Sequence, residues 1–350
     1  MEIFLTYLLF AVGVVLIVKG GDWFVDGAVW VAEVTKIPKF IIGATVISLA
    51  TTLPEVIVSS LAAAEGHSIL VSGVGDYIAA SQEKVGMAIG NGIGSVICNT
   101  ALILAISVVF MPIAVERKSF APKAVLLFVA VTTLFLFSLG GCVSVWGAIV
   151  LIIIFAAYIF ENVRSAKREA LKKPDGEETE ERPATDKKSV VINILKVIVG
   201  AAGIVFGSQL LVDNASKIAS SWGVSEAVIG VTIVAVGTSL PELITAVTSV
   251  IKKQTSMSVG NVIGANVIDT TLILAVCSFI YGGNLPVSKM NIYLDFPVAI
   301  IVTLLAAVPT IINKKFSRWQ GATLLVVYIA YLLTVTLFAD KYLALFGVIA

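Results

Sequence analysis

Ten apolar segments, each long enough to cross a lipid bilayer, account for most of this 350-residue chain. A membrane-spanning helix needs about 20 consecutive apolar residues to cross the hydrocarbon core. Because a helix satisfies its own backbone hydrogen bonds inside lipid, the segments predict an all-α membrane protein with ten transmembrane helices. The segments lie at residues 3–19, 39–63, 85–110, 121–139 and 143–160, and at 190–211, 226–251, 258–281, 292–312 and 320–339.

Composition excludes several other classes of protein. Hydrophobic residues make up 58% of the chain and the mean hydropathy is +1.01, which an ordinary soluble or disordered chain does not reach. With a formal net charge of +1 and no basic stripe, the chain is not expected to bind nucleic acid. The cysteines have no zinc-type spacing and are interpreted as packing residues: Cys98, Cys142 and Cys277. The first segment lacks the basic start and cleavage site of a signal peptide, so we take it as the first membrane helix.

Residues 161–188 differ from the rest of the chain, because charges of both signs cluster there and large apolar residues almost vanish. This composition predicts a solvated linker between a first five-helix repeat, residues 1–160, and a second, residues 189–350. Basic residues follow the fifth span directly, at Arg164, Lys167 and Arg168. The positive-inside rule therefore places the linker in the cytoplasm and both termini on the extracellular or periplasmic side of the cell membrane.

The two halves resemble each other in sequence. With a shift of 187, Gly13 corresponds to Gly200 and Gly20 to Gly207; with a shift of 170, Asn99 corresponds to Asp269. Because five spans, an odd number, precede the linker, the second half must enter the membrane in the opposite orientation. The chain is thus predicted to be two inverted five-helix repeats. The change in shift implies an extracellular insertion of about 17 residues around His67 to Glu83.

One motif occurs in both halves, as Ala50-Thr-Thr-Leu-Pro-Glu55 and as Gly237-Thr-Ser-Leu-Pro-Glu242. Each proline removes a backbone donor, so we expect the helix to bend or break there and to free carbonyl groups one turn earlier. A carboxylate inside a membrane span is costly and usually faces a partner or a water-filled path. Hydroxyls three or four residues before each glutamate share its helix face: Thr51, Thr52, Thr238 and Ser239.

Two further spans place polar residues four apart along one helix face. One stripe is Asn91, Ser95 and Asn99, and the other is Asn261 and Asp269, with the apolar Ala265 between them. Oxygen ligands without thiol or imidazole suit calcium, magnesium or sodium. The alternative is that these groups only join helices by hydrogen bonds, which fits Asn91 and Asn261 best and the two glutamates least.

These residues carry a resemblance to the sodium/calcium exchanger family of the calcium/cation antiporter superfamily, in its prokaryotic form. The matching signatures are the two motifs above, together with Gly90-Asn-Gly-Ile-Gly-Ser-Val-Ile-Cys-Asn99 and Gly260-Asn-Val-Ile-Gly-Ala-Asn-Val-Ile-Asp269. The resemblance implies four cation sites at the membrane midplane. Calcium would be held by Glu55 and Glu242, with carbonyl oxygens near Thr51 and Thr238. Sodium would use the carbonyl of Ser48 or Ala235 and the side chains of Thr51, Ser95, Asn99, Thr238, Glu55, Glu242 and Asp269.

The sequence departs from the family pattern at two positions. Ala265 stands where a serine is usual, which removes one sodium ligand oxygen, and Thr52 stands where serine is usual, which keeps the hydroxyl. The short linker also lacks the length of the regulatory calcium-binding domains of animal relatives.

The resemblance implies a transporter rather than an enzyme, without a cofactor, that exchanges Na⁺ for Ca²⁺ in the lipid bilayer by alternating access and works as a monomer. Two alternatives on the same fold are Ca²⁺/H⁺ exchange and K⁺-dependent Na⁺/Ca²⁺ exchange. The motif Gly73-Val-Gly-Asp76 suggests an intramembrane aspartyl protease, but the sequence has no second membrane aspartate paired with Asp76. A receptor or scaffold would not need matched buried glutamates.

Overall fold

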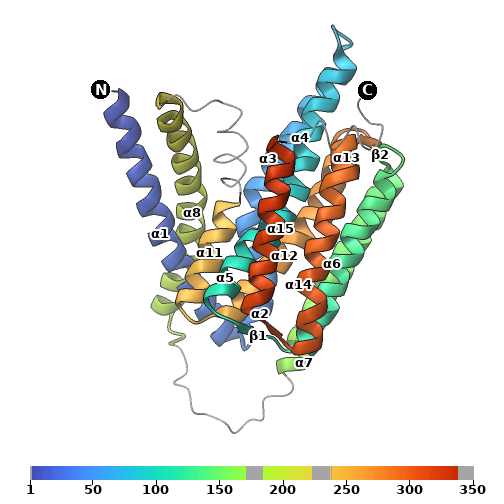
Figure 1. Cartoon of the computed structure of the whole chain (residues 1–350). Coiled ribbons are helices and arrows are strands. Elements are labelled where there is room, and N and C mark those ends of the chain that lie inside the picture. Colours follow the sequence, from blue (N-terminus) through green and yellow to red (C-terminus); the bar gives the residue numbers. More distant parts are fainter. Residues whose placement is uncertain (1, 171–183, 223–236, 238, 338–350) are drawn as a thin grey trace. The chain divides into compact units, whose positions relative to one another are not determined.

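The structure, a computed structural model, describes residues 2–170, 184–222, 237 and 239–337 (Figure 1). Within these residues nine helices are long and apolar enough to cross a membrane, and they confirm nine of the ten predicted spans. They cover residues 4–35, 39–72, 77–110, 117–138, 145–168, 187–221, 255–280, 291–313 and 318–337. The span predicted at 226–251 is described only in part, as the short apolar helix α11 (Leu240–Ile251).

The chain divides into two compact units, and each unit draws on both halves of the sequence. Unit 1 comprises residues 1–51 and 162–262, and unit 2 comprises residues 52–161 and 263–350. The boundary between them falls inside three helices: α3 (Ser48–Ser72), α7 (Val145–Ala170) and α12 (Thr255–Val267).

Unit 1 contains two long helices that pack against each other over most of their length, α1 (Glu2–Thr35) and α8 (Lys187–Ser221), drawn in blue and olive in Figure 1. Glycines allow the backbones to approach: a Cβ at Gly13 would lie 3.0 Å from the Gly207 carbonyl oxygen, and one at Gly20 would lie 2.8 Å from that of Gly200. As the residue number increases along α1, the number of the contacting residue on α8 decreases, so the two helices are antiparallel. Gly13 corresponds to Gly200 in the other repeat, and Gly207 corresponds to Gly20. Replacing each residue of the Gly13–Gly207 contact by its counterpart therefore gives the Gly20–Gly200 contact, as a two-fold relation between inverted repeats requires.

The rest of unit 1 packs around this pair. Helix α2 (Lys39–Ile42) leads into the π-helix η1 (Gly43–Ile47), whose Gly43 lies close to the backbone of Met257 on α12. A buried apolar cluster, which includes Phe24, Ile47, Ile204 and Met257, joins the elements of this unit.

The two repeated prolines stand at different places in their helices. Of the predicted bend or break, the break is not found at Pro54, because helix α3 runs through the proline. The π-helix η1 lies just before α3. In the second copy, Pro241 stands in the first turn of α11, after the N-cap residue Ser239. A proline is well tolerated there, since its missing N–H would have no helical partner.

Unit 2 contains the remaining helices and four very short strands. In chain order the elements are α4 (Tyr77–Cys98), η2 (Asn99–Leu104), α5 (Ala105–Phe110), β1 (Ile113–Ala114), α6 (Arg117–Ser138), β2 (Cys142–Val143), η4 (Ile268–Ile273), α13 (Leu274–Ile280), β3 (Leu285–Pro286), η5 (Asn291–Asp295), α14 (Phe296–Asn313), β4 (Lys315–Phe316) and α15 (Arg318–Leu337). The labels η2, η4 and η5 mark π-helices.

The strands of unit 2 pair across the two halves of the sequence. β1 is antiparallel to β4, with Ile113 opposite Phe316, and β2 is antiparallel to β3, with Val143 opposite Leu285. β1 and β3 follow corresponding spans of the two repeats, as do β2 and β4, so the two pairings are copies of one another. Unit 2 therefore has its own two-fold relation between inverted repeats.

The predicted insertion around His67 to Glu83 is mostly helical, because α3 and α4 both extend into it. The helices are joined by a turn in which Gly73 (φ +61°) and Gly75 (φ +67°) adopt the left-handed conformation that favours glycine. The Glu65 carboxylate forms an ion pair with Lys84 at 2.9 Å across this helical hairpin. Asp76, the residue that suggested a protease, is exposed and caps α4 by accepting a hydrogen bond from the Ala79 amide.

Candidate cation site

The predicted site residues that the structure describes are all buried. Glu55 and Glu242 are each only 1% exposed, and Asp269 is fully buried. Unit 1 holds Ser48, Thr51, Ser239 and Glu242, whereas unit 2 holds Thr52, Glu55, Ser95, Asn99 and Asp269. Thr238 and Ala235 lie outside the described residues. Carboxylates this deep in membrane-spanning helices are costly, which favours a functional role for them.

In unit 1, an amide on α12 connects the first copy of the motif to α11. The Asn261 Nδ2 group donates to the Thr245 hydroxyl at 2.8 Å, and the Thr51 hydroxyl donates to Asn261 Oδ1 at 3.4 Å. Thr245 follows Glu242 by one helical turn, so Asn261 holds α11 just beyond the glutamate. Glu242 itself lies in the first turn of α11, where the partial positive charge of a helix N-terminus favours a carboxylate.

In unit 2, the corresponding asparagine makes a similar contact. Asn91 on α4 donates through Nδ2 to the Ser59 hydroxyl at 2.9 Å and to the Glu55 carbonyl oxygen at 3.5 Å. Ser59 follows Glu55 by one turn on α3. In each half, therefore, an asparagine on the partner helix is bonded to a hydroxyl one turn beyond the motif glutamate.

The two equivalent residues Asn99 and Asp269 contact each other. The Asn99 Nδ2 group donates to Asp269 Oδ2 at 3.4 Å, and each residue lies at the start of a π-helical segment, η2 or η4. A residue that contacts its own counterpart must lie next to the two-fold axis of unit 2. Asn99 Oδ1 is buried and has no hydrogen-bond partner within the described residues. A buried amide oxygen without a partner lowers the stability of the fold by about 1–3 kcal/mol, unless a cation, a water molecule or a hydrogen-bond donor contacts it.

Some polar residues beside the candidate site were not predicted from the sequence. Asn266 donates through Nδ2 to the Thr100 hydroxyl at 2.7 Å, beside the Asn99–Asp269 contact. Ser59 and Thr245 were also missed, although their spacing of four and three residues from the glutamates was a readable signal. The position of Asn266 has no such signal, since its counterpart in the first repeat is Val96.

The chemistry of these groups is that of hard oxygen ligands. Carboxylates, amide oxygens and hydroxyls suit Ca²⁺ and Na⁺, whereas zinc and copper favour thiolate and imidazole. Among the described residues, no group of three or more His, Cys, Asp or Glu side chains could hold a metal ion.

Comparison with known proteins identifies the family. A sequence model described as "Sodium/calcium exchanger protein" matches residues 5–163 and 192–337. An uncharacterized membrane protein of Methanocaldococcus jannaschii is 33% identical over 91% of this chain and 94% of its own length. The sodium/calcium exchanger MaX1 of Methanosarcina acetivorans is 27% identical over 93% of this chain and 97% of its own. The structure also matches that of the sodium-calcium exchanger NCX_Mj soaked without Na⁺ and Ca²⁺, with a TM-score of 0.77 and 31% identity, over 95% of this chain and 99% of that chain.

The resemblance seen in the motifs is thereby confirmed, and so is the fold, an all-helical membrane protein with inverted repeats. The family consists of transporters rather than enzymes. The chain belongs to the sodium/calcium exchanger protein family.

Proposed function

We propose that this protein exchanges Na⁺ for Ca²⁺ across the cell membrane by alternating access, and that Glu55 and Glu242 serve one and the same Ca²⁺ ion. The observation that carries the proposal is the pair of buried glutamates, each 1% exposed and each repeated with its Thr/Ser-Leu-Pro context in an inverted repeat. Two intramembrane carboxylates in matched positions match the double charge of calcium.

The remaining ligands are assigned by charge and by the family resemblance. Calcium is held by the two glutamates with carbonyl oxygens near Thr51 and Thr238. Sodium ions use the carbonyl of Ser48 or Ala235, the hydroxyls of the motifs and the two glutamates. Sodium binding also involves Ser95, Asn99 and Asp269.

Coupling follows from electrostatics. An empty site with several carboxylates is too negative to be moved across the membrane, because each charge repels the others and has lost its hydration. One Ca²⁺ or several Na⁺ ions neutralise that charge, so Ca²⁺ and Na⁺ compete for the same oxygen ligands. Either load then permits the change between outward-facing and inward-facing states, which couples the two fluxes.

The topology proposed with this function places both termini outside and the linker at 161–188 in the cytoplasm. Basic residues support this topology, because they follow spans that end in the cytoplasm under this arrangement. They are Arg117, Lys118, Lys252, Lys253, Lys314, Lys315 and Arg318.

The test is Ca²⁺ uptake by proteoliposomes under separately imposed Na⁺, H⁺ and K⁺ gradients, with Glu242→Gln as the inactive control. We expect an outward Na⁺ gradient to drive uptake in the wild type and not in the variant. Uptake that ignores the Na⁺ gradient and follows the H⁺ gradient would instead assign Ca²⁺/H⁺ exchange. Uptake that requires K⁺ together with Na⁺ would assign K⁺-dependent exchange.

A further inference from the structure

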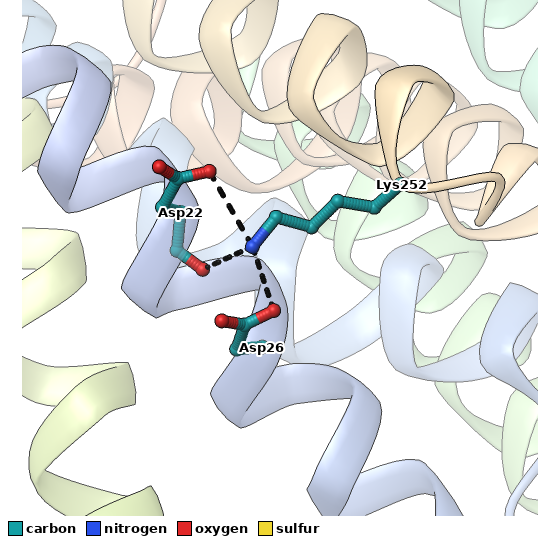
Figure 2. Close-up of polar contacts among 3 residues, drawn as sticks. All are labelled: Asp22, Asp26 and Lys252. Carbon is teal, nitrogen blue, oxygen red and sulfur yellow. Dashed lines mark hydrogen bonds and ion pairs between the residues drawn. The ribbon is translucent and has the colours of Figure 1, made fainter.

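Lys252 connects two helices of unit 1 by three contacts (Figure 2). Its Nζ group lies 2.6 Å from Asp26 Oδ1 and 3.4 Å from Asp22 Oδ1, and it donates to the main-chain carbonyl of Asp22 at 3.0 Å. Both aspartates lie one turn apart on α1, and Lys252 is the C-cap residue of α11. The ammonium group therefore binds two carboxylates and one carbonyl of the same helix face.

The contact lies beside a close approach of α1 to α11. A Cβ at Gly21 would lie 2.8 Å from the Ile244 side chain and 3.0 Å from the Thr248 hydroxyl. Helix α11 begins with Glu242 in its first turn and ends at Lys252, so the ion pair fixes the far end of the helix that presents the glutamate. Under the proposed topology this end faces the cytoplasm.

This ion pair has no counterpart at the corresponding positions of the two repeats. In the first repeat, the counterpart of Lys252 is Glu65, so a basic residue is replaced by an acidic one. In the second repeat, the counterparts of Asp22 and Asp26 are Gln209 and Asp213. The sequence therefore offers no equivalent ion pair at the opposite end.

The surface of α3 that corresponds to the contact on α11 is also in a different environment. Ile57, the counterpart of Ile244, is 56% exposed, and Leu61, the counterpart of Thr248, is 62% exposed. Ile244 and Thr248 themselves are partly buried against α1. Exposure therefore differs between these corresponding residues of the two repeats.

We propose that Lys252 is a positioning residue that locks α1 onto α11 in the state closed to the cytoplasm, and that the absence of a counterpart biases the exchanger toward that state. The inference rests on the alternating access proposed above. A partly exposed ion pair is weak, and here the aspartate side chains are 44% and 47% exposed. Its loss should shift the equilibrium between states by about two- to fivefold.

The experiment measures half-saturating Ca²⁺ from each face of the membrane, with the full chain reconstituted in a single orientation. In Lys252→Met, we expect the half-saturating concentration to rise by about two- to fivefold at the outer face and to fall by a similar factor at the cytoplasmic face. A variant that is merely less stable or less active would change both faces in the same direction.

Two variants serve as controls. Lys253→Met removes the same charge from the adjacent position, where no ion pair is formed within the described residues, and should leave both values unchanged. Lys252→Arg keeps the charge and should restore most of the wild-type asymmetry. Equal values for Lys252→Met and Lys253→Met, or shifts in the same direction at both faces, would overturn the proposal.

A second measurement does not depend on transport. Amide hydrogen exchange of residues 20–35 on α1 should be faster in Lys252→Met than in Lys253→Met, because the contact with α11 opens more often. If the wild type shows no Na⁺-driven Ca²⁺ flux, the proposed function fails while this comparison still tests the contact. Equal exchange in the two variants would show that Lys252 does not hold α1.

Discussion

Replacement of Gly20 by alanine tests the antiparallel packing of α1 on α8. The new Cβ would lie 2.8 Å from both the Gly200 carbonyl oxygen and the Ile204 amide nitrogen, and 3.0 Å from the Gly203 carbonyl carbon. All three are backbone atoms, so no side-chain rotation relieves the overlap and the helices must separate. Overpacking of this kind costs about 1–3 kcal/mol. Alanine also stabilises a helix by about 1 kcal/mol relative to glycine, which offsets part of that cost.

A matched control removes the propensity contribution. Gly86 is in the helix α4, and a Cβ there would meet no atom of the described residues within 4 Å. Gly86→Ala should therefore keep the gain in helix propensity without a clash. Gly20→Ala should be less stable than Gly86→Ala by about 1–3 kcal/mol, measured by denaturant unfolding in mixed micelles. Equal stability of the two variants would refute the close packing at Gly20.

The remaining predictions concern the polar groups. Asn261→Ala removes the amide that bonds Thr51 and Thr245, and it should lower the unfolding free energy by about 1–3 kcal/mol in the same micelle assay. Under the proposed function, Asp269→Asn should raise half-saturating Na⁺ by about tenfold, or 1.4 kcal/mol, in Ca²⁺ flux measurements, because a sodium ligand loses its charge. Ala265→Ser should lower half-saturating Na⁺ by restoring the hydroxyl that the family pattern has there; an unchanged value would show that this position is not a ligand.

Much of the fold was predictable because lipid simplifies the problem. Without water to satisfy backbone groups, apolar segments of sufficient length must form helices, and nine of them do so within the described part of the chain. The corresponding glycines Gly13, Gly20, Gly200 and Gly207 indicated the inverted repeat, and the structure shows them in contact as the exchange of halves requires. Length was predicted less well: α1 extends to Thr35, well beyond the apolar stretch, since polar residues continue a helix outside the hydrocarbon.

The features that could not be predicted depend on contacts between distant residues. The β1–β4 and β2–β3 pairings join residues far apart in sequence and are only two residues long, so they leave no periodic pattern. The π-helices η2 and η4 contain Asn99 and Asp269, and a π-helical turn has no sequence signature of the kind that predicts an α-helix. At Pro54, local chemistry predicted a bend or break, and α3 continues through the proline without a break.

The most direct test of the central claim is the number of Ca²⁺ ions bound per chain. Isothermal titration of the purified full-length protein in Na⁺-free buffer should give one high-affinity Ca²⁺ per chain. Under the proposed function, Glu55→Gln alone and Glu242→Gln alone should each abolish that binding, because we propose that both carboxylates serve the same ion. Retention of high-affinity Ca²⁺ binding in either variant, or two independent sites that are lost one at a time, would contradict the account.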